Sequence, residues 1–176
     1  MKSYHPSQSS YHFSVDDVFE SLIEVSDRKI PLFDHPFFAF IKKLHDDYGA
    51  TVECYLFYQN EVRSRLRNLK EVTASIKETI ERNPWLRFGA HALDSANAPY
   101  NQNPADLTKI FDSIYSEISR FAGGKNFSSF VRLHYFSEMY EMAGYFGKRK
   151  VKALFSTDKS ALSWRMPTKI KDDLQN

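Results

Sequence analysis

The sequence predicts an α/β protein in which β-strands and α-helices alternate within a single domain. Apolar segments typical of strands alternate with segments in which apolar residues recur every three or four positions, as on one face of a helix. Most of the expected strands end in charged or imidazole side chains. The length of 176 residues, 42% of them hydrophobic, is enough for one domain with its own core.

The first part of the chain contains two expected strands with helical segments between them. The first strand covers residues 11–15 and is followed directly by Asp16 and Asp17, after which apolar residues take helical spacing. A further helix is expected over residues 36–48, because Pro36 suits a first helical position and Gly49 a C-terminal stop. Residues 50–58 are rich in β-branched and aromatic side chains, which predicts the second strand.

The middle of the chain repeats this alternation. A helix is expected over residues 69–80, where Leu69, Val72, Ile76 and Ile80 form an apolar stripe. A short strand follows over residues 86–91 and ends in His91. The clearest helix runs over residues 104–121, because Asn103 suits its N-cap and one face is consistently apolar.

The last part supplies a strand over residues 129–136, a short helix over 138–146 and a fifth strand over 151–155. The resulting order, βαβαβαβαβ, predicts right-handed crossovers and a parallel sheet. A complete barrel of eight such units takes ~250 residues, or at least ~200. We therefore expect an incomplete or distorted parallel (β/α) barrel with about five units, a truncated or minimal version of a larger one.

The ends of the chain are more polar than its middle. We expect a disordered N-terminal tail over residues 1–10, a single α/β domain over 11–168 and a polar C-terminal tail over 169–176. Five parallel strands leave two open sheet edges. Either the C-terminal residues fold back over the opening, anchored by Leu162, Trp164 and Met166, or the chain forms an oligomer through these edges.

Charge and composition narrow the range of partners. A formal net charge of +2, from 24 Lys and Arg against 22 Asp and Glu, predicts neither a nucleic-acid nor a membrane partner. The N-terminus has no apolar signal-peptide core, and no stretch approaches the ~18 apolar residues of a membrane span, so we expect a cytoplasmic location. The one cysteine, Cys54, is expected to be buried in a strand, and the charges at 61–67 to form solvated surface.

Polar side chains at the strand ends are the candidates for function. Asp16, Asp17 and His91 lie at the ends of expected strands, and the strand expected over 129–136 carries Arg132 and His134. In parallel α/β folds the carboxyl ends of the strands surround the ligand site, so these side chains are expected to face one cleft. Four of them have an ordinary alternative, since Asp16 and Asp17 could cap the following helix and a lone histidine is often hydrogen-bonded in the core. Arg132 lies in an apolar strand, where a buried guanidinium needs an anionic partner such as Asp16 or Asp17.

The same residues resemble the motifs of the polysaccharide deacetylases. The matching segments, in the family's order, are Ser14-Val15-Asp16-Asp17, Gly89-Ala90-His91 with Ser95, Arg132-Leu133-His134-Tyr135, and Leu154-Phe155-Ser156-Thr157-Asp158 with Trp164. The resemblance spans roughly residues 11 to 164. It implies a distorted (β/α) barrel of the deacetylase type that removes acetyl groups from amino sugars with a divalent metal.

In this comparison each strand-end residue takes a role. The resemblance implies that Asp16 is the catalytic base, that Arg132 orients Asp16, and that Asp17 and His91 are metal ligands. A carboxylate next to a metal suits this chemistry, because the metal acidifies its bound water and the carboxylate takes the proton. The expected metal is zinc and the expected partner is a carbohydrate.

The sequence also departs from the family pattern. The family's second histidine, four residues after the first, is replaced by Ser95, which is a poor zinc ligand. His134 from the neighbouring strand is the expected third ligand, with Asp94 as another source of a carboxylate. The family's late Leu-x-His motif has no counterpart here. Two hypotheses therefore stand, a metal-dependent deacetylase and a catalytically inactive relative that binds a glycan or a protein.

Overall fold

The structure is a computed structural model that describes residues 12–137 and 139–155. The expected tails at 1–10 and 169–176 therefore lie outside the described residues, as does the proposed C-terminal fold-back. Within the described part of the chain, no helix is long and apolar enough to cross a membrane.

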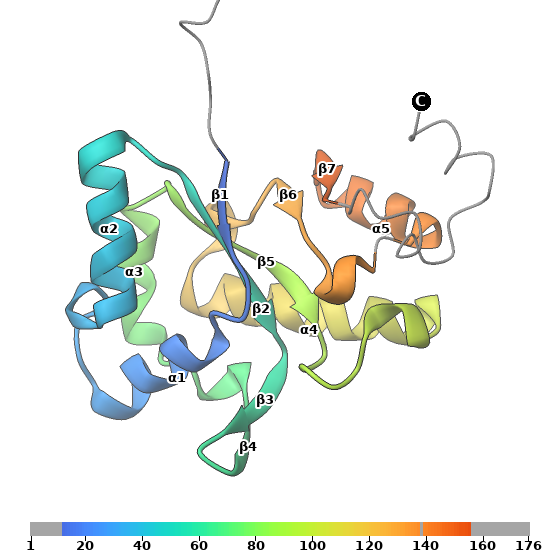
Figure 1. Ribbon diagram of the computed structural model, residues 1–176, viewed down its shortest axis with the longest axis horizontal. Helices are drawn as coiled ribbons and strands as arrows, with labels where there is room; N and C mark the ends of the chain where they lie inside the picture. The colour runs from blue at the N-terminus through green and yellow to red at the C-terminus, as the bar shows by residue number, and fades with distance from the viewer. Residues whose placement is uncertain (1–11, 138, 156–176) are drawn as a thin grey trace, which may run out of the picture.

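A three-stranded parallel sheet forms the centre of the fold (Figure 1). It contains β1 (Phe13–Val15), β2 (Val52–Phe57) and β5 (Leu86–Ala92) in the order β1-β2-β5. β2 is central and buried along its whole length, whereas β1 is partly exposed at one edge. The parallel pairing agrees with the crossover pattern expected from the sequence.

Two shorter strands extend this arrangement beyond β5. A parallel bridge joins Phe88 to Phe127, and the Ser128 backbone N–H donates to the Phe88 carbonyl at 2.8 Å. Next come β6 (Phe130–Val131) and β7 (Ala153–Leu154), which pair in parallel with each other. The strands of the described residues do not close on themselves. The barrel expected from the sequence stays a prediction.

The helices cover the sheet and the strand connections. The α-helices are α1 (Phe19–Arg28), α2 (Pro36–Tyr48), α3 (Lys77–Glu81), α4 (Pro104–Phe121) and α5 (Ala143–Lys148). Short 3-10 helices are η2 (Leu32–Asp34), η3 (Leu69–Glu71), η4 (Ala74–Ile76), η5 (Pro99–Asn101), η6 (Gly124–Asn126), η7 (His134–Phe136) and η8 (Tyr140–Met142). α2 and α4 have the limits predicted from the sequence.

Two predicted elements are wrong in their extent. Residues 69–80 do not form one helix but two 3-10 turns followed by the short α3, because Asn68 and Thr73 each cap a new turn and Val72 is extended. The strand predicted over 129–136 is limited to β6. A strand could not continue to residue 136, because Tyr135 and Phe136 both adopt left-handed backbone conformations, with φ of 55° and 50°.

An antiparallel hairpin of β3 (Gln59–Val62) and β4 (Arg65–Asn68) follows β2, and the sequence did not predict it. Its turn residues, Arg63 and Ser64, have positive φ values of 51° and 61°, as in a type I′ turn. The hairpin extends away from the central sheet beside α1 (Figure 1). The charges at 61–67 are therefore not simply solvated surface.

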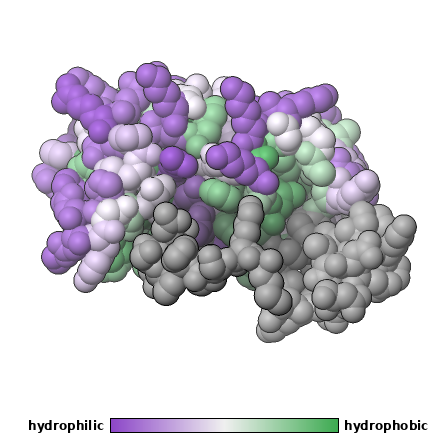
Figure 2. All heavy atoms as spheres, turned by 90° about the horizontal axis from the view of Figure 1, so that it is seen from above, coloured by the Kyte–Doolittle hydropathy of each residue, from purple (hydrophilic) through white to green (hydrophobic). Residues whose placement is uncertain are grey.

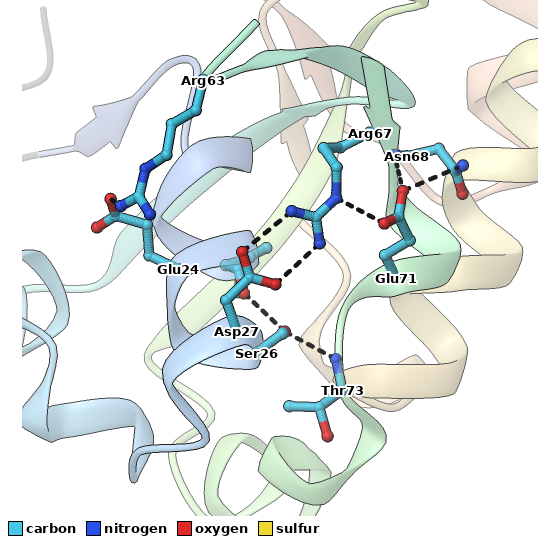
Figure 3. A network of polar contacts seen from close by, with 9 residues as sticks. Glu24, Ser26, Asp27, Arg63, Arg67, Asn68, Glu71 and Thr73 are labelled. Carbon is cyan, nitrogen blue, oxygen red and sulfur yellow. Dashed lines mark hydrogen bonds and ion pairs between the residues drawn. The ribbon is translucent and has the colours of Figure 1, made fainter. Parts of the chain in front are cut away.

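Ion pairs join this hairpin to α1 in an arrangement that we call the hairpin network, made of Glu24, Asp27, Arg63, Arg67 and Glu71 (Figure 3). The two terminal nitrogens of Arg67 donate to the Asp27 carboxylate at 2.9 and 3.0 Å, and its Nε donates to Glu71 at 2.5 Å. Arg63 donates to Glu24 at 2.7 Å. The Arg67 side chain is only 13% exposed, so its guanidinium group contacts carboxylates of the protein more than it contacts solvent.

The two faces of β2 have different surroundings. Val52, Cys54 and Leu56 point into the hydrophobic core beneath the helices. Cys54 is buried as expected, and burial raises the pKa of its thiol, so it is not a reactive cysteine. Tyr55 lies between them in sequence and faces the other side of the sheet.

One outer face of the molecule carries hydrophilic side chains around a smaller hydrophobic area (Figure 2).

Candidate metal centre

The strand ends bring the predicted site residues to one place. Asp16 and Asp17 follow β1 directly, and Asp17 takes a left-handed backbone conformation with φ of 58°. His91 lies within β5, one residue before its end, and Arg132 follows β6 directly. His134 begins η7, two residues later.

Three of these side chains form what we call the metal cluster, Asp17, His91 and His134. Their possible ligand atoms all lie within 4.8 Å of one another. Nε2 of His91 is 3.6 Å from Oδ1 of Asp17 and 3.2 Å from Nδ1 of His134. His91 is buried, whereas the Asp17 side chain is 58% exposed, so the cluster is open to solvent on the aspartate side.

Backbone carbonyl groups fix which nitrogen of each imidazole carries a hydrogen. Nδ1 of His91 lies 2.6 Å from the Arg132 carbonyl oxygen, and Nε2 of His134 lies 3.1 Å from the Ser95 carbonyl oxygen. Because a carbonyl oxygen only accepts hydrogen bonds, each of these nitrogens donates. The remaining nitrogens, Nε2 of His91 and Nδ1 of His134, carry lone pairs, and they face each other.

Two lone pairs at 3.2 Å repel unless a proton or a cation lies between them. Burial lowers the pKa of His91, although the nearby Asp16 carboxylate opposes this, so the ring favours its neutral form. Two nitrogen ligands of a tetrahedral zinc ion, with bonds of ~2.0–2.1 Å, are ~3.3 Å apart. The donor set and its spacing therefore fit a divalent metal, and the carbonyl partners resemble the outer hydrogen bonds that orient metal-binding histidines.

Arg132 holds the second aspartate of the pair. Its Nε and Nη2 lie 2.9 and 2.8 Å from Oδ1 of Asp16, and both side chains are partly buried. The same residue accepts the His91 hydrogen bond through its carbonyl oxygen. Arg132 thus connects the two halves of the site, since its side chain orients Asp16 and its backbone orients a histidine of the metal cluster.

Aromatic rings line the metal cluster. The Phe57 ring centroid lies 5.2 Å from that of His91 and 5.0 Å from that of His134. Tyr135 packs on His134 at 4.1 Å and is 55% exposed. The histidines therefore have a dry side formed by Phe57 and an exposed aromatic side formed by Tyr135.

Ser95, four residues after His91 in the sequence, orients His134 through its carbonyl group. Its hydroxyl donates to Oδ1 of Asn60 in the hairpin at 2.9 Å. The carboxylate of neighbouring Asp94 accepts hydrogen bonds from the backbone N–H groups of Ala96 and Asn97. Asp94 is therefore engaged in its own loop and is absent from the metal cluster.

The five predicted site residues, Asp16, Asp17, His91, Arg132 and His134, are thus neighbours in the structure. The residues of the fourth motif, Asp158 and Trp164, lie outside the described residues. The sequence did not point to the Ser95 carbonyl group or to Tyr55, whose ring lies behind Arg132. Comparisons of the chain with protein-family models, with curated proteins and with solved structures found no match.

Proposed function

We propose that the chain is a metal-dependent hydrolase that removes acetyl groups from amino sugars of a carbohydrate. The observation that carries the proposal is the pair of imidazole lone pairs facing each other beside Asp17. Such an arrangement costs free energy in a fold without a cation, because no hydrogen bond satisfies both nitrogens. The carbohydrate substrate rests on the motif resemblance alone.

In this proposal Asp17, His91 and His134 hold the metal, with zinc as the expected ion. A zinc ion held by these residues would supply a water molecule of lowered pKa and would polarise the acyl carbonyl group. The ligand set of two imidazoles and one carboxylate leaves room for that water molecule.

The chain's own residues then handle the proton. Asp16 is the general base, because its carboxylate lies next to the metal cluster without belonging to it. Arg132 holds Oδ1 of Asp16 through two nitrogen contacts, which leaves the other carboxylate oxygen to take a proton from the attacking water. Asp16 and Asp17 therefore have different roles despite being neighbours.

A second candidate function is a catalytically inactive relative that binds a glycan or a protein partner. Ser95 in place of the family's second histidine favours this alternative. The exposed Tyr135 ring beside His134 suits a sugar ring in either case, since aromatic faces bind apolar faces of ligands.

Metal analysis tests the proposal first. We expect about one zinc ion per chain in wild-type protein prepared without chelators, and a loss of zinc in Asp17→Ala. Asp46→Ala, which removes an exposed aspartate from α2, is the matched control and keeps its zinc. Absence of stoichiometric metal in wild type and in Asp46→Ala would remove the mechanism.

Turnover separates the two functions. Acetylated chito-oligosaccharides are the substrates, and released acetate is the measured product. A deacetylase loses turnover in Asp16→Asn but keeps its zinc, because Asp16 is not a ligand in the proposal. A zinc-binding protein that binds these sugars without releasing acetate favours the inactive relative.

A further inference from the structure

The face of the sheet opposite the hydrophobic core carries polar and aromatic side chains next to the metal cluster. Glu53, Tyr55 and Phe57 alternate along β2 on the face opposite the hydrophobic core. Glu53 and Tyr55 are both buried, although Glu53 carries a carboxyl group. The proposed mechanism uses neither of them.

Tyr55 lies against the groups that the mechanism does use. The guanidinium carbon of Arg132 is 5.7 Å from the centre of the Tyr55 ring, within the range of a cation–π interaction. The Tyr55 ring is also nearly parallel to that of His91, with centroids 6.3 Å apart and an interplanar angle of 15°. One ring thus supports both the cation on Asp16 and a histidine of the metal cluster.

The Tyr55 ring is held at its hydroxyl and along one edge. Its hydroxyl lies 3.2 Å from the Phe130 carbonyl oxygen and 3.4 Å from the Glu53 carboxylate, and Ser128 also donates to Glu53. Gly89 leaves space for the ring, because a Cβ atom there would lie 3.1 Å from two of its carbons. The ring has little freedom to turn or slide.

We propose that Tyr55 is a positioning residue that holds the Arg132 guanidinium on Asp16. The inference rests on the proposed function for its catalytic meaning, but its geometry is independent of any metal. An aliphatic side chain such as leucine would fill part of the same space without attracting the cation. Loss of the ring should therefore release Arg132 more than loss of equal volume elsewhere in the core.

The hydrogen on Nε of Arg132 reports this directly, because it is the one donated to Asp16 at 2.9 Å. Its exchange with water is measured by NMR in metal-free protein. In Tyr55→Leu we expect exchange to be roughly 3- to 30-fold faster, the factor set by a cation–π interaction in a partly buried site. In Tyr55→Phe, which keeps the ring, we expect a change of less than about threefold.

Phe88→Leu is the matched control, because Phe88 is fully buried on the other face of the sheet, against Phe121. It removes a core aromatic ring and should leave the Arg132 exchange rate unchanged. If Tyr55→Leu does not fold, Gly89→Ala presses on the ring, which must shift by a few tenths of an ångström, and a smaller acceleration in the same direction is expected. Wild-type exchange in whichever of these variants folds, or equal acceleration in Phe88→Leu, overturns the inference.

Turnover keeps this inference separate from the proposed function. Where the wild type releases acetate, Tyr55→Leu should lower kcat by a similar factor and leave KM unchanged, because Arg132 acts on the base rather than on the substrate. A higher KM with an unchanged kcat would contradict the positioning role, because it would mean that Tyr55 acts on substrate binding. A wild type without turnover counts against the deacetylase, whereas the exchange measurement still decides the role of Tyr55.

Discussion

The metal cluster and the hairpin network both gather ionisable side chains, but the hydrogen bonds within them differ. In the hairpin network every close contact joins a donor to an acceptor, as Arg67 does with Asp27 and Glu71 (Figure 3). In the metal cluster two acceptor nitrogens face each other, on His91 and His134. Satisfied charges at a surface stabilise a fold modestly, whereas unsatisfied acceptors persist where a ligand completes them.

The two regions also hold different structures together. The hairpin network ties β4 to α1 and η3, and both β4 and α1 lie in the lower part of Figure 1. The metal cluster joins the ends of β1 and β5 with the turn that follows β6. Substitutions in the hairpin network should therefore lower the free energy of unfolding and leave metal affinity unchanged. Substitutions in the metal cluster should lower metal affinity and have little effect on the free energy of unfolding.

The largest expected effect comes from His134→Gln. This change removes the imidazole ligand, so zinc affinity should fall more than ~100-fold, beyond the loss caused by removing an outer partner of a ligand. It also removes one of the two opposed lone pairs, and this gain offsets the loss of the His134 bond to the Ser95 carbonyl oxygen and of its ring contacts, so the metal-free protein should keep about the stability of the wild type. Titration calorimetry measures the affinity, and urea unfolding with a chelator measures the stability.

His45→Gln is the matched control for this change. His45 stacks on Trp85 at 4.5 Å and bonds to the Ala50 carbonyl oxygen, so it has structural contacts but lies outside the metal cluster. We expect it to bind zinc normally and to be less stable. Normal zinc binding by His134→Gln would show that His134 is not a ligand.

The sequence predicted those features whose signals are local. α2 begins with a proline, and α4 begins after Asn103, whose side chain accepts a hydrogen bond from the Asp106 N–H at 2.9 Å. The hairpin was missed because its turn uses Arg63 and Ser64 where glycine or asparagine would signal positive φ. The apolar stripe at 69–80 is buried as expected, but several short turns present it, since caps interrupt the helix.

The site was predictable in part for the same reason. Asp16, Asp17 and His91 follow from the rule that strand ends converge, and no tertiary knowledge is needed for it. The orientation of His134 depends on the Ser95 carbonyl group, and a backbone group leaves no mark in a sequence. Tyr55 lies within an apolar run, so its side chain reads as core although it contacts Arg132.

A smaller effect is expected from Arg67→Ala in the hairpin network. The change removes ion pairs with two carboxylates, Asp27 and Glu71, and should lower the free energy of unfolding by about 1 kcal/mol, the upper range for partly exposed pairs. Zinc affinity should stay at the wild-type value. Arg82→Ala, which removes an exposed arginine outside the network that pairs with Glu78, is the control and should change the free energy of unfolding less and leave zinc affinity unchanged. An equal loss of zinc affinity in Arg67→Ala would mean that the two regions are coupled.

The smallest expected effect is the pH dependence of the Asp27 contribution. The hydrogen bonds from Arg67 hold the pKa of Asp27 below its ordinary value of 3.8, against the opposing effect of burial. A lowered pKa in the folded state stabilises the fold above the unfolded value, and this stabilisation is lost as the pH falls through the folded value.

Asp27→Asn should therefore cost ~0.2–1 kcal/mol near pH 7, because the Asp27 side chain is 43% exposed, and almost nothing once the pH lies below the folded-state pKa of Asp27. Urea unfolding across this range measures the difference. In an Arg67→Ala background the same substitution should show a much smaller pH-dependent cost, since only the weaker effects of Arg63 and Arg65 on Asp27 remain. An undiminished cost in acid, or in that background, would show that Asp27 stabilises the fold through contacts other than its ion pair with Arg67. The hairpin network would then no longer be an example of satisfied ion pairs to set against the metal cluster.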